Sequence, residues 1–91
     1  MRWEKVTPPL MVNAGPDKTY TGVPVQLEAS HSGGQEPYTY EWSPSEGLDD
    51  PTVLQPMAAP EETTVFTLIV TDSQGFNGSD EVTVTVETPP P

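Results

Sequence analysis

Residues 63–87 read TTVFTLIVTDSQGFNGSDEVTVTVE, and this stretch decides the fold. Apolar side chains occupy every second position in each half: Phe66, Leu68 and Val70, then Val82, Val84 and Val86. A period of two predicts β-strands with one buried and one exposed face, here over residues 63–71 and 78–87. Between them, Asp72-Ser73-Gln74-Gly75 predicts a hairpin turn, because Asp suits the first turn position and Gly the position that needs a positive φ.

Working outward, the same pattern bounded by Pro and Gly predicts further short strands. They cover residues 10–14, with an extension over 18–20, and residues 23–30, 38–43 and 52–58. Pro56 makes the last of these an edge strand, since proline cannot donate to a ladder. No stretch shows helical periodicity, so we predict an all-β domain of six to seven strands packed as two sheets. Its expected core consists of Trp42, Tyr40, Leu27, Phe66, Leu68, Val70 and Val84.

Proline-rich sequence flanks this pattern on both sides. Residues 1–9 end in Thr7-Pro8-Pro9, and residues 88–91 are Thr-Pro-Pro-Pro. Such tracts are extended, semi-rigid spacers that do not join sheets. We therefore expect one β-sandwich domain over residues 10–87 with a linker on each side, as in a chain of domains.

The composition excludes several classes of function. Three Lys and Arg residues against 14 Asp and Glu give a formal net charge of −11, which repels nucleic acid and anionic membranes. With no cysteine, the chain has no disulfide, thiolate nucleophile or Cys-ligated metal. Two interpretations of the acidity remain, solubility and the binding of a divalent cation.

Four segments together resemble a known family. They are residues 12–17 (VNAGPD), 37–42 (PYTYEW), 66–75 (FTLIVTDSQG) and 82–86 (VTVTV). In order and spacing they are similar to the PKD (polycystic kidney disease) domain, an immunoglobulin-like β-sandwich. The family's usual Trp-x-Phe-Gly-Asp-Gly turn is absent, and residues 42–51 read WSPSEGLDDP instead. This departure is similar to a branch of the family found in bacterial surface and secreted proteins, and it puts in doubt any role of the missing turn.

The resemblance implies a non-catalytic spacer or interaction module, extracellular or at the cell surface. Its parent would be a multidomain protein such as a polysaccharide-degrading enzyme or a protease. Its partners would be the neighbouring domains of the same chain, with the domain itself a monomer that needs no cofactor. The alternative is a module that binds polysaccharide or a matrix protein weakly through exposed aromatic side chains.

Asn13, Asp17 and Asp72 are the calcium candidates, because oxygen ligands from separate loops at one end of a sandwich can bind Ca²⁺. Some relatives in secreted proteases bind calcium near their first strand, but the acidic loop used there is replaced here by residues 31–36 (HSGGQE). In the alternative, the three side chains accept hydrogen bonds from backbone N–H groups of their own turns.

Trp3, Tyr20 and Phe76 are the candidate ligand contacts, because they fall outside the alternating core positions. Two or three exposed, coplanar aromatic rings would form a platform for sugar rings. In the alternative, Trp3 belongs to the linker and Phe76 covers the end of the hairpin.

No residue pattern indicates catalysis. His31 is expected in a Gly-Gly loop, which lacks the rigid support that a general base needs. The adjacent carboxylates at 49–50 and 61–62 are expected on solvated loops rather than across a cleft. Residues 77–79 (NGS) match the acceptor pattern for asparagine-linked glycosylation, which is relevant only in a source that uses that route.

Overall fold

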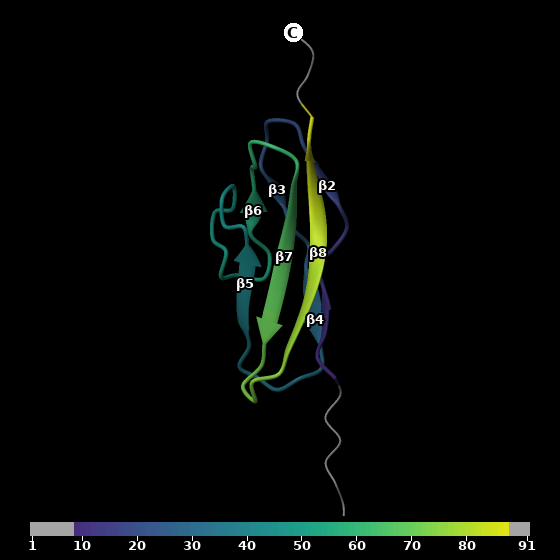
Figure 1. Ribbon diagram of the computed structural model, residues 1–91, viewed down its shortest axis with the longest axis vertical. Helices are drawn as coiled ribbons and strands as arrows, with labels where there is room; N and C mark the ends of the chain where they lie inside the picture. The colour runs from purple at the N-terminus through teal and green to yellow at the C-terminus, as the bar shows by residue number, and fades with distance from the viewer. Residues whose placement is uncertain (1–8, 88–91) are drawn as a thin grey trace, which may run out of the picture.

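The computed structural model describes residues 9–87, and within them the chain forms strands and no helix. The fold is an all-β, immunoglobulin-like sandwich (Figure 1). It has eight short strands, β1 (Met11–Asn13), β2 (Lys18–Tyr20), β3 (Val25–Gln26), β4 (Ser30–Ser32), β5 (Thr39–Ser43), β6 (Met57–Ala58), β7 (Thr64–Thr71) and β8 (Asn77–Val86). In the described part of the chain no helix is long and apolar enough to span a membrane.

One layer is a four-stranded sheet in the order β2-β8-β7-β5. The predicted hairpin is its centre, with β7 and β8 antiparallel from Thr71↔Asn77 to Thr64↔Val84. β5 pairs antiparallel with the other side of β7, while β2 pairs parallel with the end of β8. The predicted extension over residues 18–20 is thus a separate strand, joined to the opposite end of the chain.

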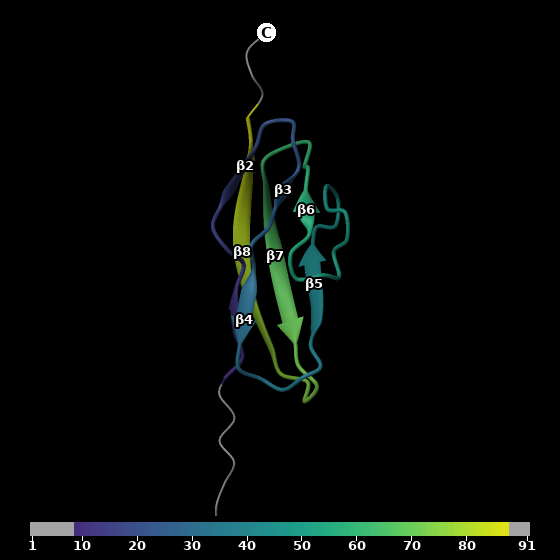
Figure 2. The same cartoon turned by 180° about the vertical axis from the view of Figure 1, so that it is seen from behind.

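The other layer consists of two antiparallel ladders, β1 with β4 and β3 with β6 (Figure 2). The single strand expected over residues 23–30 is divided here, because residues 27–29 leave the ladder and bond to the loop before β6 instead. The Leu27 N–H donates to the Pro56 carbonyl at 3.0 Å, and the Gln55 side chain donates to the Ala29 carbonyl at 2.9 Å. For the same reason only the end of the expected strand 52–58 forms β6.

The core lies between the layers and draws on both. Its buried apolar residues are Ala14, Leu27, Ala29, Trp42, Ala58, Phe66, Leu68, Val70, Val82 and Val84. Six of the seven side chains that the alternation assigned to the core are therefore fully buried. Tyr40 is only partly buried, since its ring packs against the core while its hydroxyl group reaches His31 at 3.0 Å.

Two aspartates fix the crossover from β1 in one layer to β2 in the other. The Asp80 carboxylate accepts a hydrogen bond from the Ala14 N–H at 2.9 Å. The Asp17 carboxylate accepts one from the Thr83 N–H at 3.0 Å. Both carboxylates therefore tie the start of the domain to β8, its last strand.

Candidate functional site

Asp72 organises the β7–β8 turn, and it is the only buried charged residue in the part of the chain that the structure describes. One carboxylate oxygen accepts the N–H groups of Gln74 at 2.9 Å and Phe76 at 3.0 Å. The other faces the Gln35 N–H at 3.3 Å, which joins the hairpin to the loop before β5. Both oxygens are thus occupied by backbone donors.

The other two calcium candidates are also hydrogen-bonded, and they lie elsewhere. Asn13 accepts the Gly15 N–H at 2.8 Å within its own turn. Asp17 bonds the Thr83 N–H in β8, whereas Asp72 bonds the Phe76 N–H just before β8 begins. Thr83 lies seven residues after Phe76, so the two carboxylates are separated by roughly 20 Å along the strand. Among the described residues there is no group of three or more His, Asp or Glu side chains that could hold a metal ion. The structure does not bring the three candidates together.

The aromatic candidates do not share a surface either. Phe76 is 69% exposed at the hairpin end, whereas Tyr20 is partly buried against the core. Tyr20 pairs with Val86 at the far end of the ten-residue β8, so the two rings are separated by roughly 30 Å. Trp3 lies outside the described residues. Tyr20 and Phe76 therefore form no common platform.

His31 lies in β4, so the expectation that it sits in a loop was wrong. Its ring packs on Tyr38 and Tyr40, with centroids 4.4 and 5.5 Å away, and its Nε2 lies 3.0 Å from the Tyr40 hydroxyl. Its Nδ1 is buried and hydrogen-bonds none of the described residues. Since a catalytic histidine needs a third group to orient its ring, this arrangement does not form a triad.

The segment that replaces the missing Gly-Asp-Gly turn folds back over the edge of β5 and β6. The Trp42 N–H donates to Pro51, and its indole N–H donates to Val53 at 3.0 Å. Farther along, the carbonyl of Gly47 accepts the Ala59 N–H at 2.6 Å. These bonds join the segment to β5 and to the residue that follows β6.

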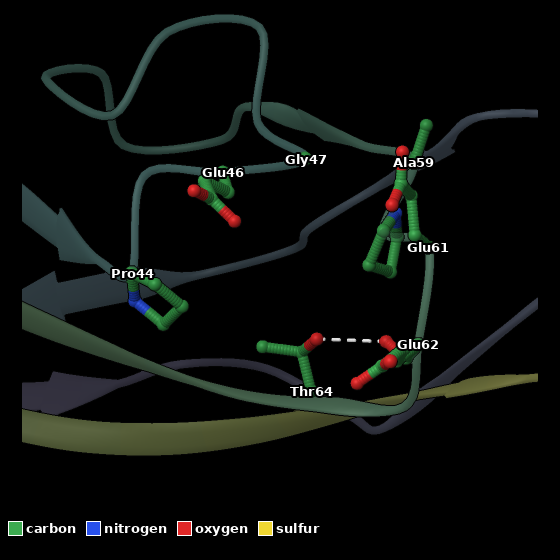
Figure 3. A pocket seen from close by; sticks show the side chains of 8 residues that line it. Pro44, Glu46, Gly47, Ala59, Glu61, Glu62 and Thr64 are labelled. Atoms are coloured by element: carbon green, nitrogen blue, oxygen red, sulfur yellow. Dashed lines mark hydrogen bonds between the residues drawn. The ribbon is translucent and has the colours of Figure 1, made fainter.

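A pocket of about 630 Å³ lies between this segment and the start of β7. Figure 3 shows the Glu46 and Glu62 side chains on facing walls of this pocket, with Pro44 and Thr64 beside them. The Thr64 hydroxyl donates to the Glu62 carbonyl at 2.7 Å. Glu61 and Glu62 are exposed, as expected, but together with Glu46 they line this pocket rather than a fully open loop.

Comparison with protein families decides the identity. The family described as K319L-like, PKD domain, matches residues 14–86, most of the chain. The chain belongs to the PKD domain family. PKD domains are in general non-catalytic modules.

Solved structures are similar to this PKD domain over nearly its whole length. The solution structure of the PKD domain from KIAA 1837 protein is 25% identical, with a TM-score of 0.68 and 98% of each chain covered. The BIgI domain of beta protein from S. agalactiae, solved bound to CEACAM1, is 16% identical, with a TM-score of 0.52, covering 89% of this chain and 97% of that one. At that identity the second likeness shows the fold alone. No curated protein sequence matches the chain.

Sequence reasoning missed Asp80 in this PKD domain and misassigned Asp17. Both side chains accept backbone N–H groups 66 residues away, not within their own turns. No local pattern separates such a bridging aspartate from a solvated one, because the partner is distant in sequence. For Asp72 and Asn13, acceptance within their own turns was one of the two alternatives that the sequence left open, and it is the one observed.

Proposed function

We propose that this PKD domain is a non-catalytic spacer in a multidomain protein that is secreted or displayed at the cell surface. The observation that carries the proposal is where the two ends of the domain lie. The chain enters through β1 beside the β7–β8 turn and leaves from the other end of β8 (Figure 1). Because β8 runs for ten residues, the entry and exit are separated by roughly 33 Å.

The pairing of β2 with β8, the last strand, suits a domain under tension. β2 lies parallel to β8 in the register Lys18↔Val84, Thr19↔Thr85 and Tyr20↔Val86. A pull on the two ends of the domain draws parallel strands past each other, so it loads their hydrogen bonds together rather than one after another. The Asp17–Thr83 bond adds a further connection beside this register.

The proposed location and partners of the domain are based on its family and on its net charge. PKD domains are typically extracellular, which supports a secreted or cell-surface parent such as a polysaccharide-degrading enzyme or a protease. A net charge of −11 opposes self-association, which supports a monomer whose partners are the neighbouring domains of its own chain. The same surface opposes contact with nucleic acid and anionic lipid.

The experiment places residues 1–91 between two fluorescent reporter domains and measures their separation by energy transfer. We expect one narrow distance distribution that is unchanged by added calcium or polysaccharide. A matched control replaces the domain by a Gly/Ser linker with the same number of residues, which should give a broad distribution. Distance distributions of equal width for the two chains would refute the proposal that the domain is a spacer.

One observation favours a second function, the weak binding of polysaccharide or a matrix protein. Phe76 is 69% exposed, and an exposed aromatic ring can stack on a sugar. Affinity electrophoresis in soluble cellulose, chitin and xylan derivatives, and pull-down on collagen, test this function. Retardation that disappears in Phe76→Ala, while circular dichroism stays unchanged, would favour binding over a passive spacer.

A further inference from the structure

Asn77 is an exposed side chain that the fold does not use. It begins β8 directly after the turn, paired with Thr71, and makes no side-chain hydrogen bond to any described residue. Ser79 lies two residues further on, so both side chains project from the same outer face of the sheet. Ser79 is also exposed and makes no side-chain hydrogen bond within the described chain. Neither residue is therefore required by packing.

The residue between them is required by packing. A Cβ at Gly78 would lie 2.9 Å from the Val12 Cγ2 atom and 3.3 Å from the Leu10 carbonyl oxygen, because β1 passes directly beneath it. At 2.9 Å the Val12 side chain would have to shift, and the Leu10 carbonyl leaves little room beside it. Gly78 points inward and is fixed by the fold, whereas the Asn77 amide and the Ser79 hydroxyl point outward. The two outward groups are free to meet an external ligand or a modifying enzyme.

We propose that Asn77 is an acceptor for an asparagine-linked oligosaccharide, recognised through Asn77-Gly78-Ser79. The donor class is a lipid-diphosphate-linked oligosaccharide, used by a membrane-bound transferase. The Asn77 Nδ2 atom forms a bond to the anomeric carbon of the first sugar, and the bond from that carbon to the phosphate breaks. The lipid diphosphate leaves, and Nδ2 loses one proton. Asn-x-Ser/Thr is the acceptor pattern for this chemistry, and the middle residue here is not proline.

The surroundings of Asn77 have room for a bulky glycan. On the outer face its cross-strand neighbours are threonines, Thr71 on β7 and then Thr39 on β5. The turn residues just before it are exposed. The adjacent Phe76 is 69% exposed, so its side chain does not pack over this end of the sheet.

The register also sets when the transfer takes place. Asn77-Gly78-Ser79 pairs with residues 69–71 once β7 and β8 have formed their ladder. A transferase that needs a free acceptor segment therefore acts before the hairpin closes. The glycan would then lie at the end where the chain enters the domain, away from the parallel pairing of β2 with the end of β8.

This inference rests on the secreted or cell-surface placement in the proposed function, but its test does not, because the experiment itself routes the chain through a secretory pathway. The chain is expressed behind a cleavable signal peptide in cultured animal cells. Secreted and retained material are both digested, and the peptide that carries Asn77 is weighed. Poor secretion therefore cannot hide the result.

We expect the peptide to gain the mass of one oligosaccharide. Its release by a glycan-cleaving amidase in heavy-oxygen water should leave a labelled Asp at position 77. The label excludes ammonia loss at Asn-Gly before the digestion, and a parallel digestion without amidase shows any loss during it. Asn77→Gln and Ser79→Ala should abolish the modification, whereas Ser79→Thr should keep it. The matched control Ser73→Ala, in the turn but outside the acceptor triplet, should change nothing.

An unmodified Asn77 in the wild-type chain and in Ser79→Thr would overturn the inference. Modification that persists in Ser79→Ala would also overturn it, since recognition would not use the triplet. Neither outcome affects the distance measurement between reporter domains, so failure of the glycan site and failure of the spacer are distinguishable.

Discussion

Replacing Asp72 by alanine tests whether a buried carboxylate holds the β7–β8 turn to the rest of the sandwich. The side chain is 6% exposed and accepts two short hydrogen bonds, from Gln74 and Phe76, and a longer one from Gln35. A hydrogen bond to a charged group contributes about 1.5–3 kcal/mol net. Counting the two short bonds at the low end, because the exposed turn lets water reach these donors, gives a loss of roughly 3 kcal/mol.

The assay is urea unfolding followed by tryptophan fluorescence. With a slope of about 1.5 kcal/mol per molar, a loss of this size lowers the midpoint by about 2 M. The urea midpoint of Asp72→Asn should lie between the midpoints of wild type and Asp72→Ala. Its amide oxygen can still accept from Gln74 and Phe76, but its NH₂ group would face another donor, the Gln35 N–H.

The matched control is Asp50→Ala. Asp50 makes the same type of turn, accepting the N–H group of Thr52 two residues on at 2.9 Å, but it is exposed. Its removal should shift the midpoint far less, because water replaces the lost partner at an exposed site. Equal shifts for Asp50→Ala and Asp72→Ala, or an Asp72→Ala midpoint within error of wild type, would refute the reasoning.

The remaining predictions concern the core, the backbone, pH and metal binding. Trp42→Ala should cost roughly 3–5 kcal/mol of unfolding free energy, since this indole is the largest buried side chain among residues 9–87. A melting temperature within a few degrees of wild type would contradict this. Gly15→Ala should destabilise more than Gly75→Ala, although both have φ near 90°. A Cβ at Gly15 would lie 2.7 Å from a backbone oxygen whereas one at Gly75 would meet nothing, and equal melting temperatures would contradict this. The Thr52 hydroxyl and N–H hold the pKa of Asp50 below its ordinary value of 3.8, so this contribution to stability is present above pH 3.8 and is lost as the pH falls through the lowered pKa. Thr52→Val should therefore raise the Asp50 pKa measured by NMR, and an unchanged pKa would count against the hydroxyl as the cause. Calorimetric titration with Ca²⁺ should show no saturable binding below millimolar concentrations, because the three candidate side chains do not come together and each already accepts a backbone N–H group, and a tight site would reverse that expectation.

The sequence by itself determined the β class of this PKD domain and the inward face of its strands. Alternation is a local property, because successive side chains of a strand point to opposite sides wherever its partner lies. Residues 63–71 therefore indicated which side chains of β7 are buried, and Asp72 and Gly75 indicated the turn that follows. The family resemblance also rested on local segments, and the match to residues 14–86 confirms it.

Only the tertiary structure decided how the strands outside the β7–β8 hairpin pair and where isolated polar side chains find their partners. Residues 18–20 pair in parallel with β8, and Asp17 and Asp80 bridge 66 residues. Residues 27–29 leave their strand because Leu27 bonds to Pro56 instead of continuing a ladder. Strands of two or three residues carry too little alternation to specify a partner or register, so these choices depend on which distant N–H and carbonyl groups the packed core brings within reach.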